Sequence, residues 1–278
     1  MNQSSGVSWL YGTVLGRGVL KIIQTCKLDH LAVAFLRSPL SKCVIGPYIK
    51  RNEIPMEEYK SEPYRTFQEF FLREKQILEF DADPLHLISP CDGWLSAYLI
   101  EEDCSFFIKG SHYGLCDLLK DPGLSQHYDH GACLIFRLCA SDYHHYCYID
   151  DGTLEESHYL EGELHSVQPI ACETYPVYTL NRRVWSLLHT DHFGPVIQTE
   201  VGALVVGGIV NHPVQGRFQR GGEKGHFDLS GSTIVMLFQK EKISLLPHIE
   251  ECLRGGQEVR VTWGMQIGTR YAPPTMTP

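Results

Sequence analysis

The sequence has too little basic charge for several classes of partner. Its 278 residues contain 24 Lys and Arg against 33 Asp and Glu, which gives a formal net charge of −9. A nucleic-acid binder needs a basic surface, so we predict no nucleic-acid partner. The same deficit gives no general attraction to an anionic membrane, and any contact with a membrane must therefore be local.

Long hydrophobic runs and paired cysteines are also missing. No stretch approaches 18 uncharged apolar residues, so we expect no membrane-spanning helix, and the first 23 residues lack the pattern of a signal peptide. The ten cysteines include no CxxC pair, which predicts scattered reduced thiols in a cytoplasmic protein and no metal site. Without a GxSxG motif, a hydrolase nucleophile elbow is excluded.

The apolar pattern predicts an α+β protein with a helical N-terminal layer on a β-rich, sandwich- or barrel-like catalytic domain. We assign residues 1–60 to the helical segment and residues 61–278 to a single catalytic domain. Residues 66–74 indicate a short helix, because Thr66 and Glu69 have the spacing of a capping box. Short apolar runs between turn residues predict the strands: WLSAYLI, SFFIKG, ACLIFRL, HYCYI, PVYTL, VIQTEVGALVVGGIV, STIVMLF and EVRVTW. In that part only residues 115–121 and 245–254 look helical.

The N-terminal segment allows two interpretations that do not exclude each other. Its apolar residues follow a helical period and can fold over the core as a cap. Alternatively, the segment is amphipathic and lies on a bilayer, with its aromatic and basic residues near the headgroups: Trp9, Tyr11, Arg17 and Lys21.

Three short stretches carry residues suited to chemistry. SPCDG (89–93) puts Asp92 in a tight turn, where a structural role would be usual. RLCASDYHHYCYIDDG (137–152) brings a carboxylate and imidazoles within one turn, a combination that can tune a general base near neutral pH. Its adjacent residues His144 and His145 should point in different directions. GGEKGHFDLSGST (221–233) is a glycine-rich approach to Ser232, which opens an apolar β-branched run.

The order of these stretches resembles the phosphatidylserine decarboxylase family. The matching blocks run collinearly from about residue 43 to 271 and are YRTFQEFFLR (64–73), SPCDG, LCASDYHHYCYIDDG, GELHSVQPIA (162–171), VGALVVGGI (201–209), RGGEKGHFDLSGST and VRVTWGMQIG (259–268). The resemblance implies a proenzyme that cleaves itself between Gly231 and Ser232 into chains 1–231 and 232–278. It also implies peripheral association with the cytoplasmic face of the cell membrane, and it allows a homodimer of processed protomers.

The implied maturation uses the serine hydroxyl. Ser232 Oγ attacks the carbonyl of Gly231, an N→O acyl shift gives an ester, and β-elimination leaves dehydroalanine, which hydrolyses to a pyruvoyl group and ammonia. This covalent pyruvoyl group forms a Schiff base with the amine of phosphatidylserine and takes up electrons as CO2 leaves. Phosphatidylethanolamine is the implied product in phospholipid biosynthesis, and no external cofactor is needed. Gly231 has no Cβ, so it permits close attack.

The family pattern assigns roles to individual residues. Asp92 and Ser232 belong to a self-cleavage triad with a histidine, His144 acts in decarboxylation, and we predict that Tyr143 lines the substrate pocket. The third triad position is a departure, because Cys147 stands where the family has its second histidine. Three outcomes follow: Cys147 is a poorer base, His144 or His145 takes over the role, or the protein cleaves slowly or not at all.

Alternative functions follow from the same residues. A related pyruvoyl enzyme would decarboxylate another amino acid or headgroup. A phospholipid-binding pseudoenzyme would keep an intact chain, and Cys147 motivates this alternative. A cysteine-nucleophile enzyme using Cys147 with a neighbouring histidine has no support from the resemblance.

Overall fold

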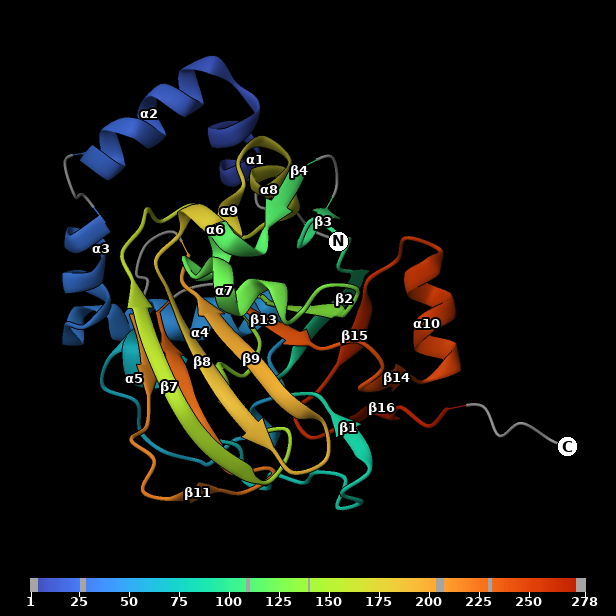
Figure 1. Cartoon of the computed structure of the whole chain (residues 1–278). Coiled ribbons are helices and arrows are strands. Elements are labelled where there is room, and N and C mark those ends of the chain that lie inside the picture. The colour runs from blue at the N-terminus through green and yellow to red at the C-terminus, as the bar shows by residue number, and fades with distance from the viewer. Residues whose placement is uncertain are drawn as a thin grey trace, which may run out of the picture.

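An eight-stranded antiparallel sheet forms the centre of the molecule (Figure 1). The computed structural model describes residues 5–25, 29–108, 111–139, 141–203, 208–229 and 232–273. The strand order is β11-β7-β8-β9-β13-β5-β2-β15. Their bounds are β2 Gly93–Leu99, β5 Ala132–Leu138, β7 Gly152–Leu160, β8 Arg183–Thr190, β9 Gly194–Val201, β11 Arg217–Phe218, β13 Ser232–Phe238 and β15 Val259–Val261. Among the described strands β11 and β15 are the two edges, so this sheet is open and does not close into a barrel.

Two three-stranded sheets pack against one face of the large sheet. One has the order β10-β12-β6 and the other β1-β16-β14, and a hairpin pairs β3 with β4. The bounds are β1 His86–Ile88, β3 Ser105–Ile108, β4 Ser111–Gly114, β6 His145–Cys147, β10 Gly208–Asn211, β12 Glu223–Asp228, β14 Ile243–Leu245 and β16 Gln266–Arg270. Side chains of both small sheets share one apolar cluster with β13, β5 and β2. The packing is therefore sandwich-like, as the sequence predicts.

The strand β13 is buried on both faces, which explains its unbroken apolar sequence. Successive side chains of a strand point to opposite faces. Ile234 and Met236 accordingly lie in the cluster shared with the small sheets, whereas Val235 and Leu237 lie in a second cluster on the other face. By the same alternation, Ser232 faces the first cluster.

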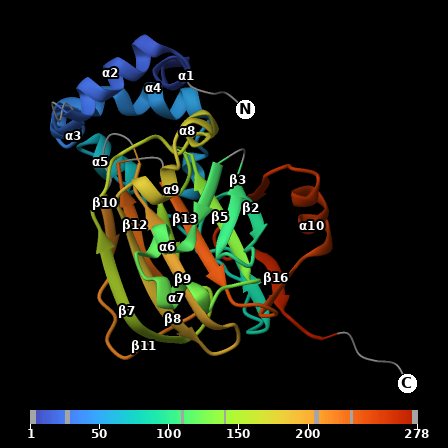
Figure 2. The same cartoon turned by 45° about the horizontal axis from the view of Figure 1, so that its top comes forward.

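The N-terminal helices form a layer at one end of the strands (Figure 2). They are α1 Ser5–Gly12, α2 Val14–Thr25, α3 Asp29–Leu36, the 3-10 turn η1 Pro39–Ser41 and α4 Lys42–Asn52. Tyr11 and Leu20 are buried in the second cluster, and Ile45 is buried in the first. The predicted helical layer is therefore confirmed, and it packs on the core. Within the described part of the chain no helix is both long and apolar enough to cross a membrane.

The short helix α5 (Phe67–Phe71) follows the predicted capping box. Thr66 Oγ1 accepts a hydrogen bond from the Glu69 backbone N–H at 3.1 Å, and the Glu69 carboxylate accepts one from the Arg65 N–H at 2.6 Å. The other short helices are η2 Met56–Glu58, α6 Leu115–Leu119, α7 Pro122–Gln126, α8 Pro169–Thr174, α9 Val177–Leu180 and α10 Pro247–Arg254. The predicted helices at 115–121 and 245–254 are confirmed.

Some sequence predictions of secondary structure are wrong. PVYTL, predicted as a strand, forms α9, where Pro176 precedes the first turn and Val177 and Tyr178 are buried. The strand β7 has a polar, half-exposed sequence, GTLEESHYL, so its apolar periodicity is too weak to detect. The strand β8 was missed as well.

Candidate active site

Ser232 is the first residue of β13 and lies between β5 and β9. Its side chain is fully buried, and its Oγ lies 3.5 Å from His144 Nδ1. In the tautomer that carries its proton on Nε2, Nδ1 can accept the hydroxyl proton. A serine beside an imidazole acceptor is the arrangement that activates a serine nucleophile.

The ring of His144 is held by residues of the 64–73 block. Phe71 stacks on the imidazole with ring centroids 4.1 Å apart and planes at 23°. The buried Arg73 guanidinium donates to the carbonyl oxygens of Ser141 and Asp142, at 2.6 and 3.0 Å, and so fixes the loop that leads to His144. Two side chains of one short segment thus orient the imidazole and its loop.

The backbone that approaches Ser232 is anchored and locally strained. Asp228, at the end of β12, accepts hydrogen bonds from Arg37 at 2.8 Å and Gln68 at 2.9 Å. Leu229 follows with φ 57°, a left-handed conformation that costs a non-glycine residue about 1–2 kcal/mol. Ser230 and the predicted cleavage residue Gly231 lie outside the described residues.

Asp92 lies at the same end of the large sheet as Ser232 but bonds to other partners. Its carboxylate accepts from Lys75 Nζ at 2.7 Å and from the Trp263 backbone N–H at 2.8 Å. In the strand register Arg137 pairs with Trp94 on one side and Thr233 on the other. The backbones of Asp92 and Ser232 are therefore about two strand spacings, roughly 10 Å, apart.

Cys147 is a fully buried core residue beside the SPCDG turn. Its Sγ lies 3.8 Å from the carbonyl oxygen of Ser89, and its backbone N–H donates to Pro90 at 2.8 Å. Burial raises the pKa of the thiol far above its usual value, although the charge of Arg220 opposes the rise and that of Asp92 adds to it. A thiol that stays protonated at neutral pH cannot serve as a general base.

His145 and Tyr143 contact side chains other than Ser232. The His145 ring stacks on the buried Tyr143 ring with centroids 4.7 Å apart, and its Nδ1 lies 2.8 Å from Glu223 Oε1. Lys75 Nζ lies 5.2 Å from the centre of the Tyr143 ring. The expectation that His144 and His145 point in different directions is thus confirmed.

The predicted site residues fall into three groups. Ser232 and His144 are together, Asp92 and Cys147 meet at the SPCDG turn, and Tyr143 and His145 form a third group. Sequence reasoning missed Lys75 as the partner of Asp92. It also missed the supporting roles of Phe71 and Arg73, although both lie in a block that it had singled out.

Comparison with known proteins gives one family over most of the chain. A family model described as phosphatidylserine decarboxylase matches residues 66–269. The phosphatidylserine decarboxylase proenzyme 2 of Clostridium acetobutylicum is 43% identical over 271 residues, which cover 96% of this chain and 92% of that protein. The phosphatidylserine decarboxylase proenzymes of Desulfitobacterium hafniense strain Y51 and Clostridium beijerinckii are 34% and 36% identical, each covering 95% of this chain and 92% of the relative.

Proposed function

Because the chain belongs to the phosphatidylserine decarboxylase family, we propose that it is a carboxy-lyase that converts phosphatidylserine to phosphatidylethanolamine and CO2. The observation that carries the proposal is the buried pair of Ser232 Oγ and His144 Nδ1, 3.5 Å apart, at the start of β13. The relatives are named proenzymes, which agrees with a protein that matures by self-cleavage.

In the proposed maturation His144 is the base that activates Ser232. His144 Nδ1 takes the proton as Ser232 Oγ attacks the carbonyl carbon of Gly231, and the peptide nitrogen leaves with a proton as the ester forms. The Cα proton of residue 232 is then removed, and the carboxylate of Gly231 departs. Hydrolysis of the remaining dehydroalanine leaves the pyruvoyl group and ammonia. The buried thiol of Cys147 has no part in this sequence.

The pyruvoyl group would consist of atoms of residue 232 itself. The residues around Ser232 therefore already leave room for it. Once formed, the group links to the substrate amine and accepts the electron pair released as CO2 leaves. His144 then lies within reach to hold a proton for the substrate carbon. Phe71 covers the imidazole and keeps water from this position.

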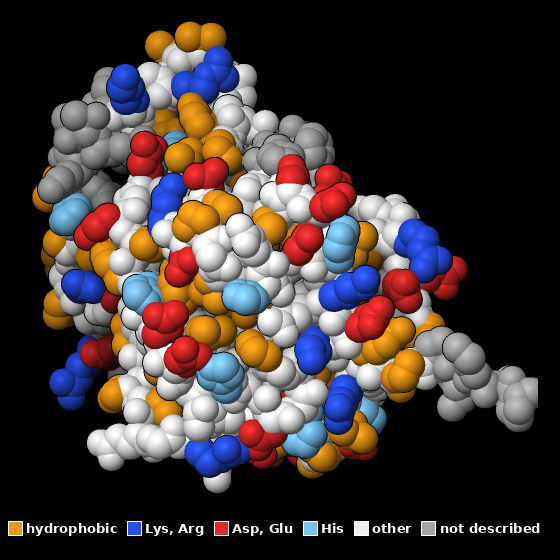
Figure 3. Space-filling view, in the orientation of Figure 1, with side chains coloured by type: hydrophobic (Ala, Val, Ile, Leu, Met, Phe, Trp, Pro, Cys, Tyr) orange, Lys and Arg blue, Asp and Glu red, His pale blue; other side chains and the backbone are white. Residues whose placement is uncertain are grey.

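Exposed apolar side chains on the helical layer support a membrane-bound phospholipid as substrate. Val14, Leu15 and Leu31 are 80%, 73% and 69% exposed. Figure 3 shows apolar and basic side chains together at the top of the molecule, where α2 lies. Such a surface can sit at a headgroup boundary. We therefore propose peripheral binding to the cytoplasmic face of the membrane through α1–α3.

The helical layer is connected to the site. Arg37, directly after α3, pairs with Asp228 at 2.8 Å, four residues before Ser232. A bilayer that contacts α2 and α3 would lie at the end of the sheet where β13 begins. A lipid headgroup at this surface would then have a short path to residue 232.

The test of membrane docking is vesicle flotation of full-length protein. Leu15→Asp should reduce flotation with phosphatidylserine vesicles, since it puts a charge into the apolar surface. Leu85, which is 48% exposed next to β1, supplies the control Leu85→Asp. Equal loss in both variants would contradict docking through α2.

The test of the reaction compares two substrates. We expect CO2 release from phosphatidylserine in mixed micelles, none from free serine, and none from either with Ser232→Ala. Release from free serine alone would favour a decarboxylase of a soluble amino acid, and an intact, inactive chain would favour the phospholipid-binding pseudoenzyme. Sedimentation of the processed protein tests the implied homodimer.

A further inference from the structure

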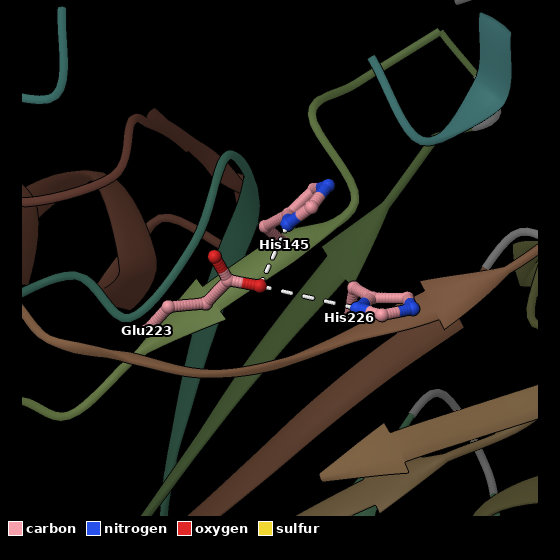
Figure 4. A group of neighbouring side chains, drawn as sticks. All are labelled: His145, Glu223 and His226. Carbon is pink, nitrogen blue, oxygen red and sulfur yellow. Dashed lines mark hydrogen bonds and ion pairs between the residues drawn. The ribbon is translucent and has the colours of Figure 1, made fainter. Parts of the chain in front are cut away.

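Three histidines surround one carboxylate oxygen on the small sheet β10-β12-β6. Glu223 Oε1 lies 2.8 Å from His145 Nδ1, 3.0 Å from His212 Nε2 and 3.9 Å from His226 Nδ1. Figure 4 shows His145 and His226 each turning a ring nitrogen towards that oxygen. The donor atoms of His145, Glu223 and His226 all lie within 4.8 Å of one another.

Strand pairing and a β-bulge bring these residues onto one face. His145 of β6 is the register partner of His226 in β12. Glu223 and His226 are three positions apart, so a regular strand would place them on opposite faces. The bulge between Glu223 and Gly225 inserts Lys224 and turns Glu223 to the side of His226. Lys224 itself is buried against Glu200 at 2.9 Å.

The orientation of His145 is the one expected for a metal ligand. Its Nε2 lies 3.3 Å from the carbonyl oxygen of Leu72, which can only accept, so Nε2 carries a proton. Metal-bound histidines usually donate their second N–H in this way. Nδ1 then faces a carboxylate oxygen, and either a second proton or a cation must lie between the two atoms.

The separations between the donor atoms are close to those expected around a small metal ion. Bonds of about 2.0–2.1 Å to nitrogen and oxygen in a tetrahedron place neighbouring donors roughly 3.3 Å apart. The observed separations of 2.8, 3.0 and 3.9 Å from Glu223 Oε1 lie on both sides of that value. His212 lies outside the group whose donor atoms are all within 4.8 Å of one another, so this half-exposed side chain would have to move further than the other three to reach a shared ion.

We propose that His145, Glu223 and His226 form a binding site for a divalent transition-metal ion, with Zn²⁺ the best match to imidazole and carboxylate donors and with half-exposed His212 as a fourth ligand that moves in when the ion binds. A hollow of about 560 Å³ is lined by Glu223 and Gly222, so it reaches the carboxylate side of the site. Ser232 Oγ lies beside His144, whereas Glu223 lies beside the other three histidines, so the proposed metal ligands and the proposed reaction centre use different side chains.

The site joins strands that are distant in sequence. The metal would tie the start of β6 to β12 and to the residue that follows β10. Because His145 directly follows His144, metal binding also restrains the backbone beside the serine–imidazole pair. We assign the ion a structural role, and the spacing of the cysteines gives no signal of a site built from histidines and a glutamate.

The experiment uses tag-free full-length protein stripped with a chelator and dialysed against Zn²⁺ or Co²⁺. We expect one ion per chain by elemental analysis, the visible absorption of bound Co²⁺, and a Tm about 5 °C higher with saturating Zn²⁺. His226→Ala and Glu223→Gln should weaken binding by about 100-fold or more. The matched control is His189→Ala, which removes a surface histidine that pairs with Glu155 on β8 and β7.

The same measurements are made on Ser232→Ala, which keeps the metal question independent of cleavage. Circular dichroism of each variant confirms that the sheet is folded. Sub-stoichiometric metal, or binding that survives both His226→Ala and Glu223→Gln, would overturn the proposal. In that case the histidines serve only to pair with the Glu223 carboxylate.

Discussion

The contrast between His144 and Cys147 gives the sharpest prediction for self-cleavage. His144→Ala removes the imidazole nitrogen that lies 3.5 Å from Ser232 Oγ. Loss of a general base typically slows a reaction by about 10²–10⁴-fold, which corresponds to about 3–5 kcal/mol in the activation free energy. We expect a delay of that size in the appearance of the two chains.

Cys147→Ala should leave cleavage nearly unchanged. The substitution removes one sulfur atom from a fully buried position whose polar contact is the carbonyl oxygen of Ser89. Loss of a single buried heavy atom costs about 1 kcal/mol of folding stability, comparable to Ile→Val. The cleavage rate should therefore stay within about threefold of the wild type, while the midpoint of urea unfolding falls slightly.

The assay is a pulse–chase of newly synthesised protein followed by a denaturing gel. His158→Ala is the matched control, because His158 is an exposed histidine that pairs with Glu156 and stacks on Trp185, away from Ser232. A Cys147→Ala variant that stalls while His144→Ala cleaves at the normal rate would refute the assignment of the base.

Three further predictions concern buried groups. In native protein at neutral pH, iodoacetamide should label exposed Cys252 but not Cys147, whose pKa is raised by burial. Mass spectrometry of the peptides measures the labelling, and early labelling of Cys147 would contradict its position in the core. Lys224→Met should lower the free energy of unfolding by about 3–5 kcal/mol, because it leaves Glu200 buried without its cation. In urea titrations the double variant Lys224→Met, Glu200→Gln should recover part of this loss. Arg73→Ala should cost about 3 kcal/mol of stability and slow cleavage about tenfold, because it releases the loop before His144. A normal cleavage rate on the same gel would show that self-cleavage does not need the hydrogen bonds of Arg73 to this loop.

Local features were predictable where one sequence signal decides the structure. Thr66 and Glu69 form the predicted capping box, because both partners lie within one turn. The unbroken apolar run after Ser232 becomes the doubly buried strand β13, since a strand covered on both faces requires such a run. PVYTL failed because burial of Val177 and Tyr178 in a short helix overrides strand propensity.

The geometry of the site was less accessible to sequence reasoning. Ser232 and His144 are 88 residues apart, and the family resemblance indicated both without saying that their side chains would meet. The resemblance also placed Cys147 in a catalytic position, but its contacts and burial are those of a core residue. The cluster at Glu223 depends on a β-bulge, which changes the facing of side chains in a way that spacing alone does not reveal.

The most direct test of the central claim is the intact mass of the purified full-length protein under denaturing conditions, with and without a carbonyl-reactive hydrazide. The proposed function predicts two chains, one ending at Gly231 and one beginning at residue 232, and a hydrazide adduct on the second chain only. A single chain of 278 residues without an adduct would contradict self-cleavage at this bond and with it the proposed decarboxylase.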